Sequence, residues 1–355
     1  VDAAAEKVRL AALERAAPRA IYFLGRVAAA TGDADRARAQ YRTLLDRYPL
    51  SFYMAQAYGR LEALDEAFAR RALDEKIARD DAPGPFLSRP YAELSSAGLE
   101  RARKLLEVGD LEPAKKELTA AGLLSEGAPS ELTWVAAHLL DQAGFVEQAH
   151  GFGKYRLTDH WAHAPAGRWR VPWEITFPRA FAELTLAETT KNRVPQSLAW
   201  AVMREESAFF PEARSVASAY GLMQLVVPTA RIVARGTGLP WDEVSLRKPA
   251  VNVALGTRLL AQLRSALPAH PALSVAAYNA GAGAVGRWLQ ARGHLEADLF
   301  IESIPYEETR NYVKKVLGSQ VAYAYLYARE GLPELLHWPL TVSRSGSSPA
   351  LAGVP

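Results

Sequence analysis

The amino-acid sequence predicts an all-α protein in which an N-terminal region of helical repeats precedes a second, mainly helical domain. Residues 1–150 are rich in Ala, Leu, Arg and Glu and poor in β-branched residues, a composition that favours helices. A spacing of glycine and alanine recurs along this region, as repeated helix pairs require. The rest of the chain shows long helical patterns and no alternating strand pattern of convincing length.

The recurring spacing joins a glycine to an alanine further along. The three copies are Gly32 with Ala37, Gly109 with Ala114, and Gly144 with Ala149. Around the first copy, Gly25, Tyr41 and Pro49 complete a tetratricopeptide-type pattern, in which glycine ends one helix and small residues let the paired helices approach closely. Such pairs stack on neighbours to bury their apolar faces, which gives a superhelix. Plain helical hairpins without solenoid order stay an alternative, because the second and third copies are degenerate.

The composition changes along the chain and predicts four parts. Gly, Pro, His and Trp concentrate in residues 151–177, which is typical of an irregular connector. Beyond it, Pro195 is placed to start a helix that reaches about Glu206, and residues 251–267 and 310–330 carry long helical patterns. The predicted parts are a helical-repeat domain over 1–150, the connector over 151–177, a second domain over 178–335 and a tail over 336–355.

Composition also limits the class of protein. The 355 residues are 49% apolar and 23% charged, with a net charge of +3 and no cysteine. These values are typical of a soluble globular protein without disulfides or cysteine chemistry. No apolar run approaches the roughly 18 residues that span a bilayer. The basic residues are spread along the chain, so we expect no nucleic-acid partner.

Three short blocks in the second half carry the candidate chemistry. Residues 204–224 end a helical stretch and close on a Gly-Leu-Met-Gln turn, residues 277–281 read Ala-Tyr-Asn-Ala-Gly, and residues 302–313 begin Glu-Ser-Ile-Pro. In this order they resemble the catalytic domain of the soluble lytic transglycosylases, lysozyme-like enzymes that cut the glycan strands of peptidoglycan. The resemblance is specific over residues 178–332, and over residues 1–150 it extends only to a helical superhelix.

The first block contains two neighbouring glutamates, of which one can be the catalytic acid. Adjacent helical residues point about 100° apart, so Glu205 and Glu206 cannot flank one glycosidic bond as a carboxylate pair. Helical phase alone does not choose between them. The resemblance implies Glu206, because the acid of the family immediately precedes a Ser-Ala-aromatic stretch, here residues 207–209.

The resemblance also implies how a single carboxylate suffices. The 2-acetamido group of N-acetylmuramic acid would attack the anomeric carbon while Glu206 protonates the departing N-acetylglucosamine. Glu206 would then act as base on the C6 hydroxyl, which closes a 1,6-anhydro ring. An intramolecular hydroxyl has a large effective concentration and can react faster than water in a pocket that excludes solvent.

The remaining site residues come from the same three blocks. The predicted substrate-binding residues are Ser215, Gln224, Tyr278, Asn279 and Glu302. Gly221 allows the tight turn, Gln224 can bond a sugar amide or hydroxyl, and Tyr278 can hydrogen-bond the acetamido carbonyl and orient it. By resemblance, Ser215 contacts the substrate and Glu302 lines the cleft without donating the proton. For Gln224 and Asn279 the alternative is a side chain that caps its own loop.

The sequence therefore predicts a peptidoglycan lytic transglycosylase that cleaves the β-1,4 bond between N-acetylmuramic acid and N-acetylglucosamine. Two alternatives stay open: a lysozyme-type hydrolase with the same acid, and a non-catalytic peptidoglycan-binding scaffold. We expect no cofactor and no metal, since His160 and His163 beside Asp159 have no further ligand cluster nearby.

The sequence also leads to expectations about binding partners and cellular location. We expect a monomer that binds peptidoglycan glycan strands and offers its repeat domain to protein partners. We also expect export to the periplasm of a Gram-negative-type bacterium, with the signal peptide absent from this chain, which starts at Val1 rather than at methionine.

Overall fold

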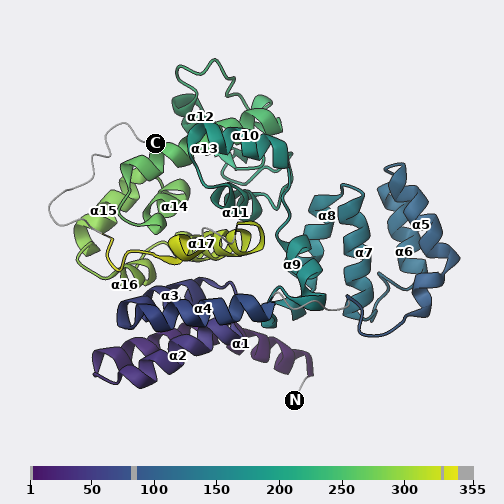
Figure 1. Ribbon diagram of the computed structural model, residues 1–355. Coiled ribbons are helices and arrows are strands. Elements are labelled where there is room, and N and C mark those ends of the chain that lie inside the picture. The colour runs from purple at the N-terminus through teal and green to yellow at the C-terminus, as the bar shows by residue number, and fades with distance from the viewer. Residues whose placement is uncertain (1–2, 81–85, 329–331, 343–355) are drawn as a thin grey trace. The chain divides into compact units, whose positions relative to one another are not determined.

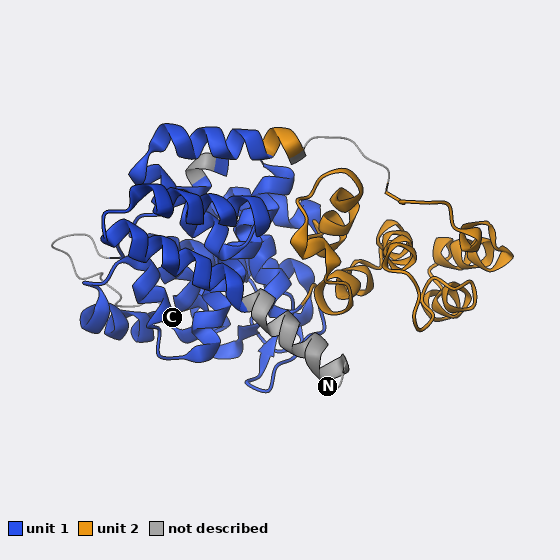
Figure 2. Cartoon of the chain, turned by 90° about the horizontal axis from the view of Figure 1, so that it is seen from below, with its two compact units in different colours: residues 1–76, 181–207, 211–355 blue, residues 77–180, 208–210 orange. Residues whose placement is uncertain are grey.

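The structure, a computed structural model, describes residues 3–80, 86–328 and 332–342 and is built almost wholly from helices (Figure 1). Within these residues the strands are β1 (Ala219–Tyr220) and β2 (Leu225–Val226), which pair antiparallel. The predicted all-α fold class is therefore confirmed. The chain divides into two compact units, which Figure 2 shows in different colours.

The first unit contains residues 1–76, 181–207 and 211–355. Its N-terminal helices are α1 (Ala3–Ala30), α2 (Ala34–Arg47), α3 (Phe52–Leu64) and most of α4 (Glu66–Asp80). Its later helices are α10 (Ala182–Asn192), α11 (Gln196–Glu206), α12 (Val227–Val233), α13 (Pro249–Ala266), α14 (Pro271–Ala280), α15 (Ala282–Arg292), α16 (Ala297–Glu302), α17 (Glu307–Tyr327) and α18 (Leu332–Leu336). A short 3-10 turn, η5 (Ser245–Arg247), precedes α13.

The second unit contains residues 77–180 and 208–210. Its helices are α5 (Ala97–Glu107), α6 (Leu111–Ala120), α7 (Ser130–Gln142), α8 (Val146–Gly151) and α9 (Arg170–Thr176), with short turns η1 (Ala92–Ser95), η2 (Phe152–Arg156), η3 (Asp159–Ala162) and η4 (Gly167–Trp169). Two clusters of buried apolar side chains hold it together, one around Trp134 and one around Leu132.

The three predicted glycine turns share one geometry. Gly32, Gly109 and Gly144 have φ angles of 82°, 78° and 86°, and each ends a helix. After each glycine the next backbone N–H donates to a carbonyl five residues earlier, at 2.9 Å in all three turns. This is the left-handed helix ending that glycine favours. The paired alanines, Ala37, Ala114 and Ala149, are fully buried, so the predicted helix pairs are confirmed at these turns.

Close packing inside the first helix pair explains a further glycine. A Cβ atom on Gly25 of α1 would lie 2.5 Å from Cε1 of Tyr41 on α2. No real side chain tolerates that distance against a buried ring, and Tyr41 is fully buried. The tetratricopeptide-type spacing therefore reports a real contact between the two helices.

Helix α17 is the centre of the first unit and packs against α11 and α14 as well as α3 (Figure 1). Tyr312, Ser319 and Tyr323 lie on one face of α17, since their spacing of seven and four residues returns to the same side of a helix. Lys314 lies two residues after Tyr312 and points about 200° away. On that other side, a Cβ on Gly318 would lie 3.2 Å from the backbone nitrogen of Phe52 on α3.

A buried carboxylate ties the N-terminal helices to the second half of the chain. Asp298 on α16 is 3% exposed and accepts hydrogen bonds from the Tyr22 hydroxyl at 2.6 Å and from Arg60 Nη2 at 2.9 Å. Arg26 also pairs with it. Burial alone would raise the pKa of Asp298, but the hydroxyl of Tyr22 and the two guanidinium groups outweigh burial and hold that pKa below its ordinary value.

These contacts place residues 16–64 in the same compact unit as the helices around α17. Phe52 on α3 also packs its ring against Trp338, with ring centroids 5.7 Å apart. The predicted domain boundaries at residues 150 and 177 stay a prediction, because a compact unit is defined by contacts and a domain by independent folding. Of the predicted tail, only residues 336–342 lie among the described residues.

The segment predicted as a connector is well packed. Trp173 stacks on Phe177 with centroids 5.4 Å apart, and its indole N–H donates to the carbonyl of His163 at 2.9 Å. The ring of His163 in turn stacks on Trp169 at 4.3 Å. His160 is fully buried among aromatic rings, so the histidines of this segment take part in packing.

Lowering the pH should destabilise the first unit through His270. Its Nδ1 accepts the backbone N–H of Ala272 at 3.0 Å and so caps α14. Burial lowers the pKa of His270 to about 4, against the pull of the Asp298 charge. The unfolded chain therefore binds more protons between pH 6.5 and 4, and stability is lost across that window, by up to about 3 kcal/mol.

Thermal melting at pH 7.5 and 4.5 measures this effect. His270→Asn keeps a good helix cap but does not titrate, so its melting temperature should fall less on acidification than that of the unaltered protein. An equal fall in both proteins would contradict the role given to His270.

Candidate active site

Helix α11 positions the predicted catalytic acid at its last residue. Pro195 is the N-cap residue, and the helix runs from Gln196 to Glu206 with seven consecutive buried residues from Leu198 to Arg204. The N–H of Ser207 still bonds to Met203, after which Ala208 and Phe209 have positive φ angles of 51° and 69°. Two successive left-handed residues cannot continue a right-handed helix, so the chain turns away directly after Glu206.

The two neighbouring glutamates have different surroundings. Glu205 pairs with Arg204, and the side chains of both are 6% exposed. It also accepts the Ser319 hydroxyl at 2.9 Å. Glu206 instead accepts the hydroxyl of Tyr312 at 2.6 Å through Oε1. The charge of Glu205 is thus compensated by a buried guanidinium.

Two tyrosines respond to the charge of Glu206. Burial raises the pKa of both Tyr278 and Tyr312 well above its ordinary value, and the charge of Glu206 adds to the effect. Both phenols therefore stay protonated and act as neutral donors. Tyr312 donates to Glu206, and Tyr278 donates to the carbonyl of Met223 at 2.8 Å.

The Gly-Leu-Met-Gln turn packs directly against this pair. Gly221 has a φ angle of 78°, and a Cβ there would lie 2.2 Å from the carbonyl oxygen of Leu246 and 2.4 Å from Nδ2 of Asn252. Any larger residue would collide with backbone. The Ser207 hydroxyl donates to the carbonyl of Leu222 at 2.8 Å and joins the turn to the end of α11.

Asn252 on α13 organises the turn through three buried hydrogen bonds. Its Oδ1 accepts the N–H of Met223 at 2.7 Å, and its Nδ2 donates to the carbonyls of Tyr220 at 2.8 Å and Leu246 at 2.7 Å. The side chain is fully buried. No sequence signal marks this residue, because a single asparagine inside a helix carries no motif.

Replacing Asn252 by alanine should destabilise the protein. Three backbone groups in a buried site would lose their partner, and even partial compensation leaves a loss on the order of 3 kcal/mol. Urea unfolding measures it. Asn192→Ala is the matched control. It removes an asparagine with two hydrogen bonds, to Glu188 and Thr257, but that side chain is partly exposed. Equal midpoints for Asn252→Ala and the unaltered protein would refute the assigned role.

Three predicted substrate-binding residues are engaged within the protein. Gln224 donates through Nε2 to the carbonyls of Ala213 at 3.1 Å and Gly221 at 2.9 Å. Asn279 accepts the Thr309 hydroxyl at 2.5 Å. Ser215 accepts the N–H of Ala219 at 3.1 Å. For Gln224 these are the loop-capping contacts of the alternative interpretation, and a role in substrate binding stays a prediction for all three.

Glu302 contacts other side chains than the remaining site residues do. Its carboxylate accepts the Tyr53 hydroxyl at 2.5 Å and the Lys314 ammonium at 3.2 Å, and it pairs with Arg19 at 3.0 Å. Lys314 and Tyr312 point to opposite sides of α17. The structure thus gathers Glu206, Tyr278 and the Gly221 turn, and holds Glu302 from the side of α1 and α3. A cleft role for Glu302 stays a prediction.

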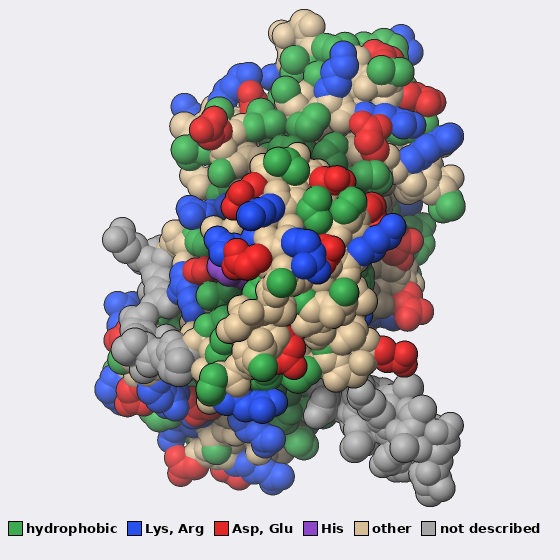
Figure 3. All heavy atoms as spheres, turned by 90° about the vertical axis from the view of Figure 1, so that its right-hand side faces the viewer, with side chains coloured by type: hydrophobic (Ala, Val, Ile, Leu, Met, Phe, Trp, Pro, Cys, Tyr) green, Lys and Arg blue, Asp and Glu red, His purple; other side chains and the backbone are tan. Residues whose placement is uncertain are grey.

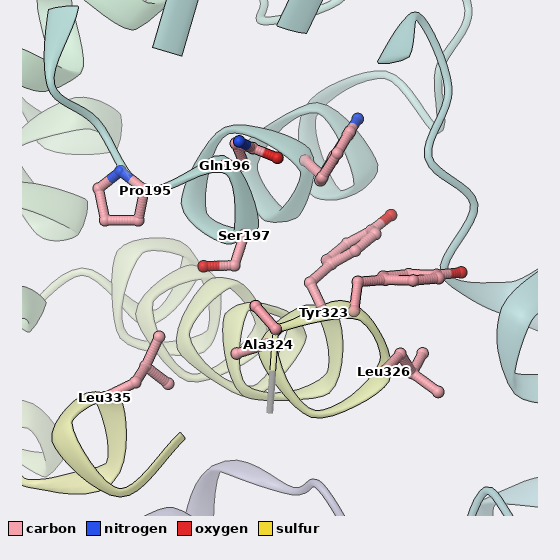
Figure 4. A pocket seen from close by; sticks show the side chains of 10 residues that line it. Pro195, Gln196, Ser197, Tyr323, Ala324, Leu326 and Leu335 are labelled. Atoms are coloured by element: carbon pink, nitrogen blue, oxygen red, sulfur yellow. The ribbon is translucent and has the colours of Figure 1, made fainter. Parts of the chain in front are cut away.

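An open pocket of about 830 Å³ lies elsewhere on α11. It is lined by Pro195, Gln196 and Ser197 at the start of α11, by Tyr323, Ala324 and Leu326 near the end of α17, and by Leu335 of α18 (Figure 4). Of its lining residues on α11, Trp200 comes nearest to Glu206, six residues before it and about 9 Å along the helix axis. Glu206 itself does not line the pocket.

Metal sites and membrane spans can be searched directly over the described residues. There, no three or more His, Cys, Asp or Glu side chains gather as metal ligands would. No helix in that part of the chain combines the length and the apolar character needed to traverse a bilayer.

Sequence reasoning missed Tyr312, although it lies in the third block. The spacing in the sequence could have indicated it. Tyr312 and Thr309 lie three residues apart and so share a face of α17. Thr309 reaches Asn279, and Tyr312 reaches Glu206. The same face thus meets the second block and the end of α11.

Parts of the chain match known protein families. Residues 183–301 match the family described as the Transglycosylase SLT domain, and residues 303–330 match the Soluble lytic transglycosylase helical domain. The soluble lytic murein transglycosylase of Escherichia coli K12 is 34% identical over 197 residues, 53% of this chain and 30% of that protein. The protein of the same name from Salmonella typhimurium is 33% identical over 202 residues, 55% of this chain and 31% of that protein.

Solved structures are similar over more of the chain. An inactive glutamate-to-glutamine mutant of the lytic transglycosylase Slt from Pseudomonas aeruginosa aligns with a TM-score of 0.64 and 26% identity, covering 90% of this chain and 47% of that one. The 70 kDa soluble lytic transglycosylase of Escherichia coli gives 0.66 and 24%, covering 91% and 48%, and this likeness shows the fold alone. The chain spans about a third of the length of the curated relatives. The predicted resemblance to soluble lytic transglycosylases is confirmed.

Proposed function

We propose that this chain is a lytic transglycosylase that cleaves peptidoglycan between N-acetylmuramic acid and N-acetylglucosamine, with Glu206 as its single acid and base. The observation that carries the proposal is the contrast between the two glutamates. Glu205 is paired with Arg204 and Ser319, while Glu206 ends α11 and accepts the Tyr312 hydroxyl. The matched transglycosylase domain includes Glu206, and the similar Slt protein is inactive as a glutamate-to-glutamine mutant.

In the first step, protonated Glu206 gives its proton to the glycosidic oxygen. The bond from the anomeric carbon breaks, and its electron pair leaves with the N-acetylglucosamine oxygen. The acetamido carbonyl oxygen of the muramic acid bonds to the anomeric carbon and forms an oxazolinium ring. Because the Tyr278 hydroxyl donates to Met223, its oxygen lone pairs remain to accept the acetamido N–H and orient this group.

In the second step, the Glu206 carboxylate removes the proton of the C6 hydroxyl. The C6 oxygen attacks the anomeric carbon, the oxazolinium ring opens, and the 1,6-anhydromuramic end forms. Glu206 is protonated again and ready for another turnover. Tyr312 keeps the carboxylate in place through its 2.6 Å bond in both steps, as general acid–base catalysis requires.

The proposed substrate also gives the proposed location. The relatives act, by their names, on murein, so we place this chain in the periplasm as an exported monomer. On the face drawn in Figure 3, basic and acidic side chains are mixed.

Digestion of purified peptidoglycan tests whether the chain is an enzyme. We expect soluble muropeptides to accumulate with time and enzyme concentration. Stable binding to the sacculi without release of fragments would instead support the non-catalytic scaffold.

A further inference from the structure

A side-chain hydrogen bond joins two helix ends next to the candidate site. The hydroxyl of Thr309, in the first turn of α17, donates to Oδ1 of Asn279, in the last turn of α14, at 2.5 Å. Thr309 is 2% exposed. A threonine inside a helix often bonds a carbonyl of its own preceding turn, as Thr189 does on α10 at 2.6 Å. The hydroxyl of Thr309 instead links two helices.

The first turn of α17 lacks a side-chain cap. Its N-cap residue, Tyr306, makes no side-chain hydrogen bond to the helix. The first turn of a helix frays easily, because its N–H groups have no partner within the helix. Arg310 bonds the carbonyl of Ile304 at 2.8 Å, but that carbonyl belongs to the loop directly before the same helix. The bond from Thr309 therefore ties this turn to a separate helix.

The position of this turn decides where Tyr312 lies. Tyr312 follows Thr309 by three residues, on the same face of α17 and about 4.5 Å further along the axis. Its hydroxyl donates to the carboxylate of Glu206 at 2.6 Å. Hydrogen bonds between two oxygens span only about 2.5–3.0 Å. A shift of the first turn by about 1 Å would therefore break the contact with Glu206.

The end of α14 is a firm support for this turn. Tyr278, directly before Asn279, donates to the carbonyl of Met223 at 2.8 Å. The N–H of Gly281 closes the end of α14 on the carbonyl of Ala277 at 2.9 Å, and α14 packs against α17. The acceptor of the Thr309 hydroxyl is thus itself held in place.

We propose that Thr309 is a positioning residue for the reaction. Through Asn279 it holds the first turn of α17 and thereby keeps the Tyr312 hydroxyl on the carboxylate of Glu206. The inference rests on the proposed function, which makes Glu206 the acid and base. Because Thr309 acts on the placement of the acid and not on the binding of the glycan, its loss lowers kcat and leaves KM unchanged.

Steady-state kinetics on soluble glycan strands test this role. Thr309→Val keeps nearly the same shape but has no hydroxyl. We expect kcat to fall about tenfold, the factor that corresponds to one lost hydrogen bond, with KM unchanged. Thr309→Ser keeps the hydroxyl and should retain near-normal kcat. In a Tyr312→Phe background, Thr309→Val should lower kcat no further, because the contact through which it acts is already lost.

Thr189→Val is the matched control. Thr189 is 1% exposed and so equally buried, but its hydroxyl bonds carbonyls within its own helix, and we expect kcat to stay unchanged. A lower melting temperature of Thr309→Val with unchanged kcat overturns the inference, as does a full further loss of kcat in the Tyr312→Phe background. A rise in KM at constant kcat also overturns it and assigns Thr309 to substrate binding. If the unaltered protein cleaves no strands, the proposed function has failed and the inference falls with it.

Discussion

Replacing Glu206 by glutamine should abolish glycan cleavage while leaving the fold and glycan binding largely intact. The amide has the same shape and its oxygen can still accept the Tyr312 hydroxyl, but it cannot deliver a proton. Loss of general acid–base help should lower kcat by on the order of 10² to 10⁴. Release of soluble muropeptides from peptidoglycan measures the rate, and a sedimentation assay with sacculi measures binding.

Glu205→Gln is the matched control for this variant. Its chemistry should survive, but the buried Arg204 would lose the carboxylate that balances its charge, which costs about 3–5 kcal/mol of stability. We therefore expect a lower melting temperature and near-normal kcat for the folded enzyme. A folded but inactive Glu205 variant beside an active Glu206 variant would show that the acid is wrongly assigned.

Removing the N-terminal helices should have the largest effect on stability. The predicted boundaries imply that the chain from residue 178 onward folds alone, but the contacts of the first unit lead us to expect the opposite. Without α1 and α3, Asp298 loses Tyr22, Arg26 and Arg60. A buried charge without partners costs several kcal/mol, and the apolar face around Phe52 would be exposed as well.

Circular dichroism melting of a chain that begins at residue 178 measures this expectation. We expect helical content without a cooperative transition at physiological temperature. Asp298→Leu in the full chain is the control. It removes the buried charge but keeps the helices, so it separates the effect of the charge from the effect of losing the helices. If the shortened chain melts cooperatively at the temperature of the full chain, the first helices are no part of the catalytic fold.

Much of the fold could be predicted because it depends on local patterns. Gly32, Gly109 and Gly144 end helices wherever the backbone must turn left-handed, and the alanine that follows each marks a close helix contact. The packing of α1–α3 against the helices around α17 could not be predicted. It depends on pairs such as Tyr22 with Asp298, 276 residues apart, which no local spacing reveals.

The candidate site also contains residues that could be predicted from the sequence and residues that could not. The three blocks identified Glu206, Tyr278 and Gly221, and the structure brings these together. The choice of Glu206 over Glu205 rested on resemblance, whereas the physical support for proposing it is the pairing of Glu205 with Ser319, 114 residues away. Asn252 carries no sequence signal at all, because its role comes from three backbone groups on separate segments.

The mass of the new glycan end tests the central claim most directly. Peptidoglycan digested in ¹⁸O-labelled water should yield 1,6-anhydromuramic ends that are one water lighter than reducing ends and carry no label. That result follows if the C6 hydroxyl, activated by Glu206, closes the ring before water enters. Reducing ends that carry one ¹⁸O atom would contradict the account, because they would show that Glu206 serves a hydrolase.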